Sequence, residues 1–124
     1  MRSRLVAVVA VAALTVVSCA ATTAEGSFDL IEFAVNGPAE LSADPQTVTV
    51  TNSGLFPHTL VVTDGDGAVV AATPLIQSGE AADMTLDLEP GQYSFTCRIV
   101  AQTPDGDLVD HFEEGMARTV TVAG

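Results

Sequence analysis

The chain has 124 residues, with 16 acidic residues against four arginines and no lysine, and its formal net charge is −12. A chain this acidic is a poor match for nucleic acid or for an anionic bilayer surface, because both attract Lys and Arg side chains. Its length suits one domain with one core, and its two cysteines are too few for the dense disulfide framework of small secreted domains. We therefore expect a single globular domain that does not bind nucleic acid.

The start of the chain has the pattern of an export signal. A basic segment, Met1-Arg2-Ser3-Arg4, precedes an apolar run over residues 5–17 that is too short to span a bilayer. The run ends in Val16-Val17-Ser18-Cys19, which resembles the lipobox of bacterial lipoproteins. This resemblance implies that Cys19 is acylated and becomes the mature N-terminus, so that a lipid anchor replaces a transmembrane helix.

On this basis we divide the chain into a signal peptide over residues 1–18, a lipidated Cys19 with a tether over residues 19–27, and one domain over residues 28–124. The protein would then be exported and held by lipid at the extracytoplasmic side of a membrane, in the periplasm or at the cell surface. The alternative is an ordinary signal peptide that is cleaved near Ala20. That cleavage would leave Cys19 available for a disulfide with Cys97.

The predicted domain has the composition of an all-β protein. Short runs of Val, Thr, Ile and Phe alternate with Gly, Pro, Asp and Asn, which is typical of strands separated by turns. No segment shows a long helical periodicity. About seven or eight short strands in one domain of this size predict a β-sandwich. The predicted strands cover residues 28–35, 47–52, 59–63, 68–72, 82–88, 92–100 and 117–122.

Few side chains in this domain can bind a transition metal, and together they form a recognisable set: His58, Cys97, His111 and Met116. Two imidazoles, one thiolate and one thioether are the ligands of a blue-copper site. The sulfur ligands favour Cu(I) and the imidazoles serve Cu(II), whereas zinc prefers a closed tetrahedron of strong ligands. Each residue alone has a simpler explanation, as a turn or loop histidine or as a buried side chain of the core.

Three segments around these residues resemble the plastocyanin-like cupredoxins. Residues 52–62, Asn-Ser-Gly-Leu-Phe-Pro-His-Thr-Leu-Val-Val, resemble the family's Asn-containing turn and Phe-Pro-His before a hydrophobic strand. Residues 90–97 resemble its Pro-Gly-x-Tyr-x-Phe-x-Cys strand, and residues 111–122 resemble its closing segment of His, Met and last strand. The order His, Cys, His, Met is also the order of the family.

The resemblance implies a Greek-key β-sandwich that binds one type 1 copper ion. It implies that His58 and His111 are the imidazole ligands and that Cys97 is the thiolate. Met116 would be the weak axial thioether, and Asn52 would fix the ligand loops. In this family the second histidine commonly lies at the surface as the electron port, so the resemblance gives that role to His111, beside an apolar docking rim over residues 55–57.

One feature departs from the family, in which few residues separate the cysteine from the second histidine. Here residues 98–110 lie between Cys97 and His111. Residues 103–106, Thr-Pro-Asp-Gly, predict a type I turn, so the two flanking arms can pair as a hairpin. With a turn on these four residues, Arg98 faces His111, and the insertion returns His111 to within about one residue of Cys97.

We therefore interpret the chain as a copper electron carrier that cycles between Cu(I) and Cu(II). We expect it to be a monomer that exchanges electrons with partner proteins, and not an enzyme, because four protein ligands leave no open position for a substrate. Two alternatives remain open: a copper chaperone or buffer with the same fold, and a structural β-sandwich without a metal.

Overall fold

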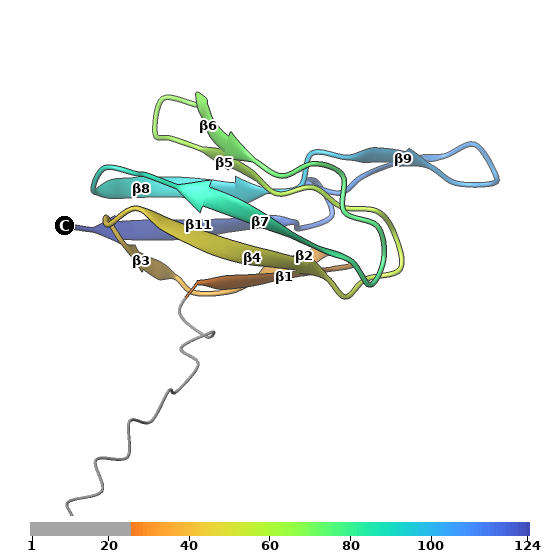
Figure 1. The fold of residues 1–124 in the computed structure, drawn as a ribbon. Coiled ribbons are helices and arrows are strands. Elements are labelled where there is room, and N and C mark those ends of the chain that lie inside the picture. Colours follow the sequence, from red (N-terminus) through yellow and green to blue (C-terminus); the bar gives the residue numbers. More distant parts are fainter. Residues whose placement is uncertain (1–25) are drawn as a thin grey trace, which may run out of the picture.

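The computed structural model describes residues 26–124. The predicted signal peptide, the lipidation site Cys19 and most of the predicted tether lie outside these residues. Eleven strands form two sheets that face each other and a separate two-stranded hairpin (Figure 1). The prediction of an all-β sandwich is confirmed. Within the described part of the chain, no helix is long and apolar enough to cross a membrane.

The first sheet has four strands in the order β2-β1-β4-β7. β1 runs parallel to β4, whereas the β1–β2 and β4–β7 pairs are antiparallel. In β4, the valines at 48 and 50 are buried and alternate with threonines on the outer face, as the sequence pattern predicted. The strand bounds are Ser27–Ile31 for β1, Ala34–Asn36 for β2, Gln46–Asn52 for β4 and Ala81–Leu86 for β7.

The second sheet has five strands in the order β3-β11-β8-β5-β6. β11 is antiparallel to β8 and parallel to β3, and β5 is antiparallel to both β8 and β6. The bounds are Glu40–Ser42 for β3, Val61–Thr63 for β5, Val69–Ala72 for β6, Gly91–Thr96 for β8 and Ala117–Ala123 for β11.

The core lies between the two sheets and extends to the end of the sandwich that carries the hairpin. Phe28 of β1 and Phe95 of β8 stack across the core with ring centroids 4.8 Å apart. Near one end, the same apolar cluster includes Cys97 and Met116, which are both fully buried. The core therefore encloses two of the predicted metal ligands directly.

Two predicted strands are divided in the structure. The predicted strand over residues 28–35 turns at Glu32 and Phe33, and its halves pair with each other as β1 and β2. The predicted strand over residues 92–100 ends at Thr96, and Val100 begins a separate hairpin. β3 was not predicted, because three residues with one buried side chain give too short a pattern to detect.

The predicted hairpin is present, but its register differs from the prediction by one residue. β9 (Val100–Gln102) pairs with β10 (Leu108–Asp110), and His111 donates a backbone hydrogen bond to Ile99, so His111 does not face Arg98. Gly106 causes this shift. Its φ is +89°, so it follows the type I turn as a third loop residue and forms a β-bulge, as is common in hairpins with three-residue loops. The insertion still leaves and returns at nearly the same place.

Candidate metal centre

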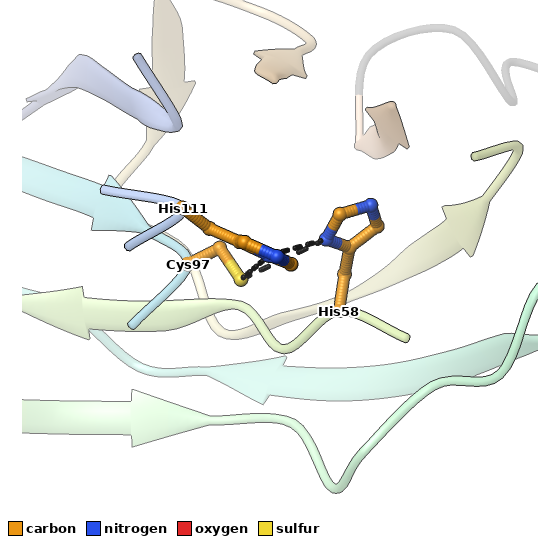
Figure 2. A group of neighbouring side chains, drawn as sticks. All are labelled: His58, Cys97 and His111. Atoms are coloured by element: carbon orange, nitrogen blue, oxygen red, sulfur yellow. Dashed lines mark hydrogen bonds between the residues drawn. The ribbon is translucent and has the colours of Figure 1, made fainter. Parts of the chain in front are cut away.

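His58 is held at one end of the sandwich by backbone pairing. Its N–H donates to the carbonyl of Ile76 at 3.0 Å, and its carbonyl accepts from the N–H of Ile76 at 2.8 Å. The segment before it contains Pro57, which fixes its own φ and limits the conformations available to the loop. The imidazole is fully buried and is directed toward the ring of His111 (Figure 2).

Cys97 and His111 are brought together by the ends of β8 and of the hairpin. Cys97 directly follows β8, and His111 directly follows β10. Met116, which is also buried, lies between them in the backbone network. Its carbonyl accepts from the N–H of Cys97 at 3.1 Å, and its N–H donates to the carbonyl of His111 at 3.0 Å. The role of its thioether as an axial ligand stays a prediction.

Three buried donor atoms converge here, as Figure 2 shows. The Nδ1 atoms of His58 and His111 are 3.2 Å apart. The Sγ atom of Cys97 is 3.8 Å from Nδ1 of His58 and 3.6 Å from Nδ1 of His111. Among the described residues, this is the one group of three His, Cys, Asp or Glu side chains placed to share a metal ion.

The spacing of these atoms suits a single ion between them. Metal bonds in proteins are about 2.0 Å to histidine nitrogen and about 2.3 Å to cysteine sulfur. Three such bonds at about 120° place the nitrogens about 3.5 Å apart and each nitrogen about 3.7 Å from the sulfur. The observed separations of 3.2, 3.8 and 3.6 Å are close to these values. The donor set and its geometry therefore fit a trigonal metal ion.

No protein-family model matches the sequence, and no curated protein matches it. Solved structures do match. A reduced auracyanin from the photosynthetic bacterium Roseiflexus castenholzii has 22% identity and a TM-score of 0.59, over 79% of this chain and 95% of its own. A purple cupredoxin from Nitrosopumilus maritimus has 21% identity and a TM-score of 0.53, over 79% and 99%. Auracyanin A from Chloroflexus aurantiacus, a "blue" copper protein, has 14% identity and a TM-score of 0.57, over 78% and 98%.

The chain has a cupredoxin fold. The similarity spans nearly the full length of each of these structures, so the likeness covers a complete domain. Within this domain, His58, Cys97 and His111 lie beside one another (Figure 2) and are positioned to bind a metal ion. The expectation of a metal centre built from three separate segments of the sequence is therefore met by the geometry.

Asn52 connects two segments beside the candidate metal centre. Its side-chain amide donates to the carbonyls of Phe56 at 2.8 Å and Ile76 at 2.9 Å, and its side-chain oxygen accepts from the N–H of Gly54 at 2.9 Å. Because Ile76 pairs with the backbone of His58, Asn52 braces the His58 loop from both sides. It makes no such bond to the segments that carry Cys97 or His111.

Glu32 is a further residue of the centre that the sequence did not reveal. Its Oε1 atom lies 3.0 Å from Nε2 of His58 and accepts hydrogen bonds from the N–H groups of Leu55 and Phe56, both at 2.8 Å. Burial alone would raise the pKa of Glu32, but these N–H groups and His58 outweigh it and lower the pKa to about 2. The sequence did contain an indication of this role. Phe28 and Leu30 are buried, and the alternation of a strand places residue 32 on the same inner face, where an acidic side chain is unusual.

The prediction that His111 lies at the surface is wrong, because its side chain is only 1% exposed. The β9–β10 hairpin and the rings of Phe33 and Phe56 cover it, around a cavity of about 130 Å³. Burial, and after it the neighbouring His58, lowers the pKa of His111, so its ring is neutral at neutral pH and can offer a nitrogen lone pair. The rest of the cavity wall is formed by Ala101, Gln102, Thr103, Pro104 and Val109.

Proposed function

We propose that this protein is a type 1 copper electron carrier that cycles between Cu(I) and Cu(II). The observation that carries the proposal is the buried triangle of two imidazole nitrogens and one cysteine sulfur, with the spacing that a trigonal ion requires. This donor set is the one that blue-copper sites use. Copper bound there supplies one-electron chemistry within a fixed set of ligands.

The chain contributes buried metal ligands and one route by which an electron can leave the metal. His58 and His111 present ring nitrogens and Cys97 presents a sulfur, from three different segments, and all three side chains are buried. Met116 is the proposed axial ligand. The hydrogen bonds of the His111 ring within residues 26–124 all involve its Nδ1 atom, and its Nε2 atom has no partner there. We propose that the electron leaves through this edge of the ring, beneath the β9–β10 hairpin and the rings of Phe33 and Phe56.

The proposed partners are redox proteins that dock at this end of the sandwich. The predicted rim is well exposed, because Leu55 is 83% and Phe56 is 51% accessible to solvent. Exposed apolar side chains that lie together are typical of surfaces that bind other proteins. We further propose that the protein is exported and held by lipid at Cys19 on the extracytoplasmic side of a membrane. The export and lipobox patterns of residues 1–19 support this proposal. We also propose that the protein is a monomer.

The test is to add one equivalent of Cu(II) to the purified protein and to record visible absorption and spin resonance. An intense thiolate charge-transfer band is expected in the wild type, and Cys97→Ser should lose it while the sandwich stays folded. A variant that keeps the band unchanged would exclude Cys97 as the ligand. Rapid, reversible reduction supports the electron carrier, whereas slow reduction with tight retention of copper would identify a copper buffer instead.

A further inference from the structure

The carboxylate of Glu32 contacts the edge of His58 that faces away from the metal centre. Glu32 lies in the turn between β1 and β2, and one oxygen, Oε1, makes all three of its polar contacts. The His58 side chain is fully buried, whereas the Glu32 side chain is 22% exposed. The charge is therefore partly shielded from water and lies directly against a proposed copper ligand.

This contact determines which nitrogen of His58 carries the proton. An ionised carboxylate can only accept hydrogen bonds, so the Nε2 atom of His58 must be the donor. In the neutral ring the Nδ1 atom then keeps its lone pair. Nδ1 is also the atom that lies 3.2 Å from Nδ1 of His111 and 3.8 Å from Sγ of Cys97. The ring is thus prepared to bind a metal on its inner side.

The same oxygen also fixes the loop that carries the ring. It accepts from two successive backbone N–H groups, those of Leu55 and Phe56, which lie just before His58. His111 has no equivalent partner, because its Nε2 atom forms no hydrogen bond within the described residues. The two imidazoles therefore differ: one has a charged acceptor behind it and the other does not.

We propose that Glu32 is a positioning residue of the metal centre, which orients His58, fixes its tautomer and strengthens it as a donor to Cu(II). This inference rests on the proposed function. Carboxylates that accept a hydrogen bond from a metal-bound histidine fix the ring and raise the basicity of the ligand, and losing one typically weakens metal binding by about 10- to 100-fold. A negative charge at this position stabilises the more positive oxidation state.

Glu32→Gln separates the charge from the hydrogen bonds. Glutamine keeps a side-chain oxygen that can accept from the same three N–H groups, but it carries no charge. We expect Cu(II) binding to weaken by about tenfold or more, with a smaller effect on Cu(I). A tenfold difference between the two states corresponds to a reduction potential raised by about 59 mV for one electron.

Asp29→Asn is the matched control. Asp29 lies in the same β1–β2 hairpin and contacts the same loop, because its Oδ1 atom accepts from the hydroxyl of Ser53 at 2.6 Å. It forms no hydrogen bond with His58. The control therefore removes one negative charge near the centre without touching a ligand, and we expect it to shift the potential much less than Glu32→Gln.

The decisive experiment on the tautomer needs no copper. Nitrogen-15 NMR of the imidazole rings in the metal-free, full-length protein should show His58 protonated at Nε2, and Glu32→Ala should reduce this preference. Protonation of wild-type His58 mainly at Nδ1 would overturn the inference. So would equal shifts of potential in Glu32→Gln and Asp29→Asn. An Nε2-protonated His58 in a protein that forms no blue site would support the positioning role and contradict only the proposed function.

Discussion

Replacing Gly54 with alanine tests how closely the His58 loop is packed on Glu32. Gly54 is buried, and its φ is not in the positive region that favours glycine, so its backbone can accept a side chain. A Cβ atom at this position, however, would lie 2.8 Å from Cδ and 2.9 Å from Oε2 of Glu32. Ordinary contacts of this kind are at least 3.4 Å, so the carboxylate must move.

The cost follows from the bonds that the displaced carboxylate gives up. Its Oε1 atom accepts from two backbone N–H groups and from His58, and a hydrogen bond to a charged group contributes about 1.5–3 kcal/mol. The full sum overstates the loss, because the Glu32 side chain is 22% exposed and water replaces part of these bonds. We expect Gly54→Ala to lower the free energy of unfolding by about 2–4 kcal/mol.

The measurement is denaturant unfolding of the metal-free protein, with Gly65→Ala as the control. A Cβ at Gly65 would meet nothing within 4 Å, so the control should change stability by no more than about 0.5 kcal/mol. In a Glu32→Ala background, Gly54→Ala should cost much less than in the wild type, because the clashing carboxylate is gone. Equal effects at Gly54 and Gly65 would refute the close approach.

Four further outcomes are expected. Met116→Leu should keep copper but shift the reduction potential, since an axial ligand tunes the ion more than it holds it; an unchanged potential and spectrum would exclude it as a ligand. Deleting the paired residues Gln102 and Leu108 together should preserve the blue spectrum, whereas deleting Leu108 alone should damage it by shifting the register. Because the pKa of Glu32 falls from 4.5 to about 2 on folding, metal-free stability should decline as pH falls through this range, and Glu32→Gln should flatten that decline in acid unfolding curves. Cys19→Ala should release the protein from the membrane fraction with copper still bound; a variant that stays in the membrane fraction would argue against the anchor.

The sequence predicted the fold class and the residues of the metal triangle because both depend on local patterns. Alternating Val and Thr in β4 identified a half-buried strand, and the three short segments placed His58, Cys97 and His111 in a known order. Glu32 could not be found in the same way. It meets His58 across 26 positions of sequence, and only after residues 28–35 have turned into a hairpin.

Two errors in the predicted site arose from single residues whose effect is three-dimensional. Gly106 was assigned to the last position of a four-residue turn, but its positive φ makes it an extra loop residue, which moved the register by one. His111 was expected at the surface because the second histidine of the family that the sequence resembles commonly lies there. The hairpin before it folds over its ring together with Phe33, and nothing in the local sequence around His111 indicates that cover.

The direction of β1 determines which end of the domain lies away from the residues through which it could be attached. The strand starts at Ser27 and leads to Glu32 beside the metal centre, a path of about 16 Å at about 3.3 Å per residue. β11 runs from next to Met116 to Ala123, so the last residues also lie at the end away from the centre, opposite the hairpin in Figure 1. Attachment through either flank, whether to a surface, an electrode or a fused protein, would therefore leave the metal-bearing end facing outward.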